Sequence, residues 1–136
     1  MAGNINLEIV TPDKAVANEE ASIVMAPGEL GEFGILIGHT PFLAALKIGA
    51  VRYVDSTGTE KFVFVNGGFA EALPDKVTIL AESAERQEDV NIDRAKASME
   101  RARERLADQT HKDETDFIRA RISLERAIQR LNMVNG

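Results

Sequence analysis

The first part of the chain alternates apolar and polar positions in short segments, as half-buried strands do. In residues 4–11, Ile5, Leu7 and Ile9 face one side and polar residues face the other. Further apolar runs follow between turn-forming residues, at 21–26, 35–37, 50–54, 61–65, 69–73 and 76–81. Segment 55–59 fits a hairpin turn, and Asn66-Gly67-Gly68 is expected to turn the chain into 69–73. This pattern predicts an antiparallel β-sandwich or barrel.

The spacing changes after Glu82 to the steps of three and four that mark amphipathic helices. Two narrow apolar seams follow this spacing: Ile92, Ala95, Met99, Ala102 and Leu106, then Phe117, Ala120, Leu124, Ala127, Leu131 and Val134. A polar link, 108–113, joins them. Asn91 or Asp89 suits the N-cap of the first helix, and Asp113 or Thr115 that of the second. The sequence therefore predicts an antiparallel two-helix hairpin.

Arginines flank both seams in the same order. Arg94, Arg101 and Arg105 recur 25 residues later as Arg119, Arg126 and Arg130. They form either a solvated surface paired with Glu100, Glu104 and Glu125, or a guanidinium-rich face for carboxylates or a phosphate. The small alanines of the seams bury little area, so we expect the hairpin to be marginally stable alone and able to detach from the sandwich.

Composition limits the possible functions. The 136 residues carry a net charge of −6, which argues against nucleic-acid and acidic-lipid binding. There is no cysteine, and the apolar runs are shorter than the roughly 20 residues of a membrane helix. The N-terminus lacks the features of a secretory signal, so a soluble cytosolic chain is expected. Acidic residues dominate up to Arg86 and balance the basic ones from Gln87 onward, which divides the chain into domains 1–86 and 87–136.

The segment from Gly28 to Gly49 is rich in glycine and holds one of the two histidines, His39; the other is His111. No nucleophile or metal-ligand pattern accompanies either histidine, so we expect no catalytic or metal site. His39 suits a turn or an interface. Glu32 lies between two glycines, where a surface acid can serve as a contact residue.

Two motifs in this segment, Gly31-Glu32-Phe33-Gly34-Ile35 and Gly38-His39-Thr40-Pro41-Phe42, resemble the signature of the epsilon subunit of F-type ATP synthases, which is called delta in mitochondria. The family commonly has proline where this chain has Ile37. Asn66-Gly67-Gly68-Phe69, residues 77–81 and the two-helix tail extend the resemblance over essentially the whole chain. The resemblance implies an N-terminal β-sandwich of about ten strands and a C-terminal helix-turn-helix.

The resemblance also implies a function. It indicates a non-catalytic rotor subunit of the central stalk that binds the gamma subunit and the c ring and couples proton flow to ATP synthesis. Glu32 and His39 would face the rotor partners. The helical tail would restrain ATP hydrolysis by meeting the catalytic beta and alpha subunits, with Arg101, Arg105, Arg126 and Arg130 as its contacts. The expected location is the cytoplasmic face of a bacterial plasma membrane, with a thylakoid membrane as the second choice and no direct lipid insertion.

Some bacterial members bind ATP on the folded hairpin as a regulatory ligand, and no cofactor is required otherwise. The matching positions are Glu85, Asn91, Arg94, Arg126 and Arg130. The family has aspartate where this chain has Asn91, a departure that bears on ATP affinity. The alternative from another class is a stand-alone adaptor or nucleic-acid-binding module with an arginine-rich hairpin. The interspersed acids and the negative net charge count against it.

Overall fold

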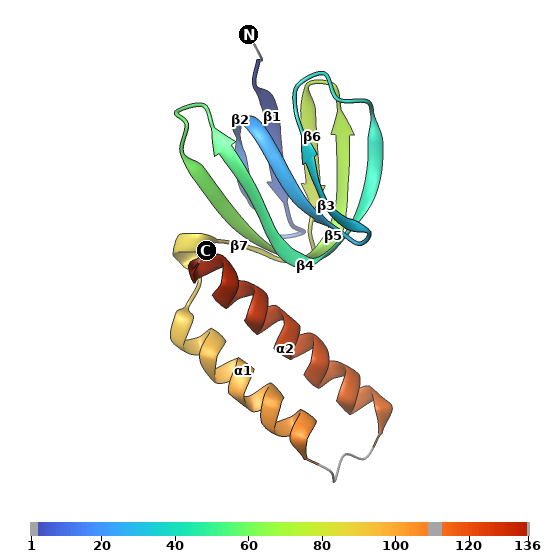
Figure 1. Ribbon diagram of the computed structural model, residues 1–136, viewed down its shortest axis with the longest axis vertical. Helices are drawn as coiled ribbons and strands as arrows, with labels where there is room; N and C mark the ends of the chain where they lie inside the picture. The colour runs from blue at the N-terminus through green and yellow to red at the C-terminus, as the bar shows by residue number, and fades with distance from the viewer. Residues whose placement is uncertain (1–2, 109–112, 136) are drawn as a thin grey trace.

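The computed structural model of the chain describes residues 3–108 and 113–135. Seven strands lie in this part: β1 (Ile5–Val10), β2 (Ala15–Gly28), β3 (Gly31–Ile35), β4 (Phe42–Asp55), β5 (Glu60–Leu73), β6 (Lys76–Leu80) and β7 (Ala84–Arg86). A 3-10 turn (Gln87–Asp89) leads into α1 (Ile92–Ala107) and then α2 (Glu114–Asn135). Figure 1 shows the strands gathered in one body and the two helices side by side beneath it.

The strands form a sandwich that closes on itself. The hydrogen-bonded order is β1-β6-β5-β4-β2-β3, and β1 also pairs with β2, which closes the path; β3 lies outside it beside β2, and β7 outside it beside β5. The β1–β6 pair is parallel and the other pairs are antiparallel. The predicted fold class is confirmed. The strands are fewer than the family estimate because β2, β4 and β5 each run for 14 residues.

The alternating pattern correctly predicts the sandwich core. Ile5, Leu7 and Ile9 of β1 are fully buried, and Tyr53 and Ile79 join them from β4 and β6. Two local predictions are wrong. Residues 35–37 are not a strand, because β3 ends at Ile35 and the next two residues lie in an exposed turn.

The Asn66-Gly67-Gly68 segment is not a turn either, because β5 runs through it without a break. Gly67 and Gly68 have φ values of 71° and 126°, which favour glycine. A Cβ atom on Gly68 would lie 2.0 Å from the Leu80 carbonyl oxygen of the neighbouring strand β6. These glycines therefore allow two strands to approach closely rather than reverse the chain.

The two helices form the predicted antiparallel hairpin. Its seam is made of buried alanines: Ala95, Ala102, Ala120 and Ala127. Asn91 caps α1 by accepting a hydrogen bond from the Arg94 amide, and Asp113 accepts one from the Asp116 amide at the start of α2. Residues 109–112 of the predicted link, with His111, lie outside the described residues. Within the described part, neither helix is long and apolar enough to cross a membrane.

Candidate functional site

The turn between β2 and β3 consists of two residues, Glu29 and Leu30. It is closed by the pair of Gly28 with Gly31 and is tied to β4 by a 3.0 Å hydrogen bond from the Glu29 amide to the Ala45 carbonyl. A Cβ atom on Gly28 would lie 2.6 Å from the Gly31 carbonyl oxygen, so glycine is required for this close approach. The turn is therefore a rigid projection, and Leu30 stands fully exposed at its tip.

Glu32 is the second residue of β3, directly after Gly31. Its carboxylate is 3.3 Å from the Arg52 guanidinium of β4, and both side chains are about half exposed. The two residues line a shallow hollow together with Gln129 and Met133 of α2. Glu32 is thus an exposed, paired acid near the helical side of the sandwich.

His39 lies beyond the other end of β3. Its ring is 4.8 Å from the Phe42 ring, and its Nδ1 is 2.5 Å from the Thr40 carbonyl oxygen. The Gly38 amide donates to the Pro74 carbonyl, which fixes this loop beside the β5–β6 turn. His39 and Glu32 therefore have different neighbours, and the structure does not bring them into one site.

An exposed apolar patch on the outer sheet face was not singled out from the sequence. Phe69 of β5 pairs with Leu80 of β6, and Leu43 lies on the same face of β4; all three side chains are more than half exposed. Phe69 and Leu80 both belong to predicted apolar strand segments, and only the register of the strands shows that these two side chains face outward. We call Leu43, Phe69 and Leu80 the outer apolar patch.

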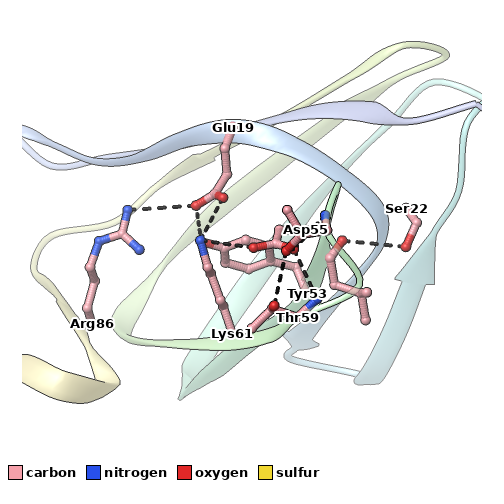
Figure 2. A network of polar contacts seen from close by, with 9 residues as sticks. Glu19, Ser22, Tyr53, Asp55, Thr59, Lys61 and Arg86 are labelled. Carbon is pink, nitrogen blue, oxygen red and sulfur yellow. Dashed lines mark hydrogen bonds and ion pairs between the residues drawn. The ribbon is translucent and has the colours of Figure 1, made fainter.

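A polar network extends from the β4–β5 turn to β7 (Figure 2). Lys61 lies between two carboxylates, 2.9 Å from Glu19 and 3.1 Å from Asp55. The Tyr53 hydroxyl donates to Glu19 at 2.7 Å, and Arg86 of β7 approaches the same carboxylate at 3.9 Å. The network ties β2, β4, β5 and β7 together.

This network shifts the pKa values of its members. Burial, reinforced by the hydrogen bond to Glu19, raises the pKa of Tyr53 to about 12. Hydrogen bonds from the Thr57 hydroxyl, the Thr59 amide and Lys61 lower the pKa of Asp55. Burial opposes ionisation of Glu19, but the bonds from Lys61 and Tyr53 outweigh it and lower its pKa. The ion pairs of this network join strands of the sandwich to one another, which indicates a structural role.

The start of α1, β7 and the end of α2 enclose a polar hollow of about 330 Å³. Four of the five residues predicted to hold ATP line it: Glu85, Asn91, Arg94 and Arg130. The fifth, Arg126, is outside this lining and donates instead to the Asn66 side chain at 3.0 Å. Asp89 adds a second carboxylate that the sequence reasoning missed. We call this space the neck hollow.

Two of the predicted arginines fasten the hairpin to the sandwich. The Arg130 guanidinium bonds to Glu85 at 2.5 Å and lies 4.4 Å from the centre of the Phe64 ring. Phe64, Val90 and Met133 are buried together beneath this contact. We call these residues, with the Arg126–Asn66 bond, the hairpin latch.

The other two predicted arginines lie on α1, away from the latch. Arg101 and Arg105 are exposed, and Arg101 donates to the Ser98 hydroxyl within its own helix. The four arginines therefore form two pairs, one engaged with the sandwich and one directed to solvent.

Two family models divide the chain between them. "ATP synthase, Delta/Epsilon chain, beta-sandwich domain" matches residues 4–87, and "ATP synthase, Delta/Epsilon chain, long alpha-helix domain" matches residues 88–135. The chain belongs to the ATP synthase delta/epsilon family. As an epsilon-type chain, it is a non-catalytic subunit.

Curated relatives extend this agreement over the whole chain. It is 54% identical over 134 residues to the ATP synthase epsilon chain of Desulforapulum autotrophicum, covering 98% of both chains. It is 50% identical over 133 residues to that of Syntrophobacter fumaroxidans, covering 98% of this chain and 97% of the relative.

Solved structures share the fold. A chain in the mitochondrial ATP synthase of Euglena gracilis, a structure of OSCP, F1 and c ring, superposes with a TM-score of 0.84 at 23% identity and covers 98% of this chain and 82% of its own. A chain in the central stalk and c ring structure of Tetrahymena thermophila mitochondrial ATP synthase gives 0.62 at 13% identity, covering 98% of both. The sandwich with its helical hairpin is therefore the family fold.

Proposed function

We propose that this chain is a rotor subunit in the central stalk of a proton-translocating ATP synthase. Its sandwich binds the gamma subunit and the c ring, and its hairpin restrains ATP hydrolysis. The chain is held to the cytoplasmic face of the membrane by these partners, without entering the lipid. The observation that carries the proposal is the division of the hairpin arginines into an engaged and an exposed pair, because it supplies the two sets of contacts that a movable brake requires.

Two separate surfaces suit the two rotor partners. The outer apolar patch is a sheet face with three exposed apolar side chains, of the kind that marks a protein interface, and we assign it to gamma. The β2–β3 turn with Glu32 projects from the sandwich, and we assign it to the polar loops of the c ring. His39, beyond the other end of β3, belongs to the gamma side.

The brake is a hairpin that exchanges one set of partners for another. In the folded state Arg126 and Arg130 are bonded to Asn66 and Glu85. Lifting the hairpin breaks these bonds, so both arginines join Arg101 and Arg105 in a cationic row that meets acidic residues of the catalytic beta and alpha subunits. Breaking the bonds to the sandwich costs free energy that offsets part of the gain from the new contacts. The folded and the lifted hairpin therefore stay close in free energy.

ATP is proposed as a weak ligand that holds the hairpin down. The neck hollow offers a carboxylate, Glu85, to accept hydrogen bonds from a base, and Arg94 and Arg130 to hold phosphate oxygens. No ion pair engages Arg94 within the described residues, so its guanidinium is available. The neck hollow fits ATP incompletely. The negative charges of Glu85 and Asp89 balance the positive charges of Arg94 and Arg130, and the Asn91 side-chain oxygen already accepts a hydrogen bond at the start of α1. Titration calorimetry with ATP tests this site: Arg94→Gln is expected to abolish the binding heat, and an unchanged affinity would refute the assignment.

The brake is tested with an ATP synthase catalytic complex that contains gamma but lacks its own epsilon subunit. We would add the full chain, the variant Arg101→Ala/Arg105→Ala, and the control Arg103→Ala, which removes a charge from the same helix. All three are expected to bind equally. The full chain and the control should lower the ATPase rate, and the double variant should restore it severalfold.

Binding of the chain, inhibition of the ATPase and the role of the two arginines are tested separately. A full chain that does not bind would refute the rotor assignment and favour the stand-alone adaptor. Binding without a lower ATPase rate would leave a coupling subunit whose hairpin is only structural. Equal inhibition by all three proteins would refute the role of Arg101 and Arg105.

A further inference from the structure

Gln87 is the first residue after β7, and its side chain reaches the end of α2. Its amide nitrogen, Nε2, donates a hydrogen bond to the Met133 backbone carbonyl at 2.8 Å, in a part-buried position. Figure 1 shows the end of α2 beside β7 and the segment that leads into α1. This contact differs from those of the hairpin latch, because it engages the backbone of α2 and not one of its side chains.

The Met133 carbonyl can be bonded only by a donor from outside the regular helix. α2 ends at Asn135, and the last four carbonyl groups of an α-helix have no amide partner within that helix. Basic side chains in the last turn often bond such carbonyls, but residues 132–135 include none. Gln87 therefore supplies a C-terminal cap for α2 from a distant part of the chain.

The segment 87–91, which we call the neck, joins the sandwich to the hairpin. All three residues of β7 pair with β5, so the backbone is held to the sandwich as far as Arg86. Further along the neck, Val90 is buried in the same cluster as the Met133 side chain. A hairpin that lifts turns about the neck, and the end of α2 then leaves Gln87, so the bond to the Met133 carbonyl breaks.

We propose that Gln87 is a positioning residue that holds the hairpin on the sandwich by capping α2; its regulatory meaning rests on the proposed brake. Arg126 and Arg130 are assigned contacts in both the folded and the lifted hairpin, whereas Gln87 has one in the folded hairpin alone. Removing the Gln87 donor therefore weakens the folded state without changing the inhibitory contacts. The net contribution of one such hydrogen bond corresponds to about a two- to twelvefold change in an equilibrium.

Amide hydrogen exchange of the isolated full chain tests the positioning role. Gln87→Met removes the donor and keeps the length of the side chain, whereas Gln87→Lys supplies a different donor at the same position. The control is Glu88→Met, at the exposed next position of the same 3-10 turn. The α2 amides are expected to exchange about two- to twelvefold faster in Gln87→Met, and close to the wild-type rate in Gln87→Lys and Glu88→Met. Amides of β4 and β5 should keep their protection in all three variants.

The ATPase rate of an epsilon-depleted catalytic complex that contains gamma tests the regulatory meaning. Each variant is added until the complex is saturated, so that differences in binding do not affect the rate. Gln87→Met is expected to inhibit ATP hydrolysis more strongly than the wild-type chain, because a larger fraction of its hairpins is lifted. Gln87→Lys and Glu88→Met should inhibit as the wild-type chain does.

Two results would overturn the positioning role. One is unchanged exchange of the α2 amides in Gln87→Met, and the other is equally fast exchange in Gln87→Met and Gln87→Lys, since the donor would then not matter. Faster exchange in Gln87→Met alone, with unchanged inhibition, would support the positioning role and refute the brake. A wild-type chain that does not bind the complex would refute the rotor function, and the exchange measurements would still decide the role of Gln87.

Discussion

Replacing Met133 by alanine is expected to loosen the hairpin from the sandwich without unfolding the sandwich. Met133 lies near the end of α2 and is 4% exposed. It packs against Phe64 of β5 and Val90, which lies just before α1. These three residues are the most deeply buried ones between the hairpin and the sandwich. The side chain therefore contributes much of the apolar contact between the two domains.

The size of the effect follows from the atoms removed. The substitution deletes three buried heavy atoms, which at about 0.8 kcal/mol for each methylene-sized group amounts to about 2.4 kcal/mol. Residual cavities raise the cost of such truncations in cores to about 2–5 kcal/mol. Ile48, Phe62 and Val134 around this site are only partly buried, so the hollow can collapse and we expect the lower part of that range. A loss of about 2–3 kcal/mol is a factor of about 30 to 150 in the detachment equilibrium.

Amide hydrogen exchange measures this loss domain by domain. The α2 amides are expected to exchange about 30 to 150 times faster in Met133→Ala, because the alanine seam stabilises the detached hairpin only weakly. Amides of β4 and β5 should keep their protection. Ile118→Ala is the control, since Ile118 lies on the same helix, is 45% exposed, and should cost less than about 0.5 kcal/mol.

Two results would contradict the predicted detachment of the hairpin. If β4 and β5 lose protection together with α2, the sandwich and the hairpin unfold as one unit and the hairpin is not a separate movable element. If Met133→Ala and Ile118→Ala have equal effects, the buried cluster does not hold the hairpin in place.

Three further predictions concern the sandwich. Tyr53 is the only tyrosine, so absorbance titration should give a midpoint near pH 12 in the folded chain and near 10 in urea. Because the pKa of Tyr53 is higher in the folded chain, its contribution to stability is complete below pH 10 and is lost as the pH rises toward 12. Tyr53→Phe should remove this alkaline loss of stability. An unchanged alkaline stability profile in Tyr53→Phe would contradict the role of Tyr53. The pKa of Asp55 is lowered in the folded chain, so its carboxylate stabilises the fold above about pH 4 and this stabilisation is lost on acidification. Asp55→Asn should therefore flatten the acid limb of a stability–pH curve. An equally steep acid limb in Asp55→Asn would show that Asp55 does not cause this loss. Gly68→Ala should lower the melting temperature far more than Gly58→Ala, which has a φ of 85° but open space around it; equal losses would show that the close approach to Leu80 is unimportant.

Local patterns predict the elements of this fold well, because each strand and helix buries one periodic face. The strand at 4–11, the hairpin around 55–59 and the cap at Asn91 depend only on neighbours in sequence. The error at Asn66-Gly67-Gly68 has a physical reason: glycine permits both a reversal and a close approach of strands, and only the position of Leu80 distinguishes them.

Local sequence patterns do not predict the contacts between the hairpin and the sandwich. Met133 falls outside the apolar seam of α2 because that helix packs on two sides, against α1 and against the sandwich. Arg126 and Arg130 were singled out as basic residues, but their partners Asn66 and Glu85 are 60 and 45 positions away. Which arginines face the sandwich therefore depends on how the helix docks, which the periodicity does not specify.

A rotor subunit must turn with the central stalk, so observing rotation tests the proposed function most directly. The chain has no cysteine, so Ser56→Cys in the exposed β4–β5 turn provides a single labelling position. The labelled chain would be assembled into a catalytic complex whose alpha and beta subunits are fixed to a surface, and the label would be followed during ATP hydrolysis. Rotation of the label in one direction is the expected result. A label that stays fixed while ATP is hydrolysed would place the chain in the stator and contradict the proposed rotor function.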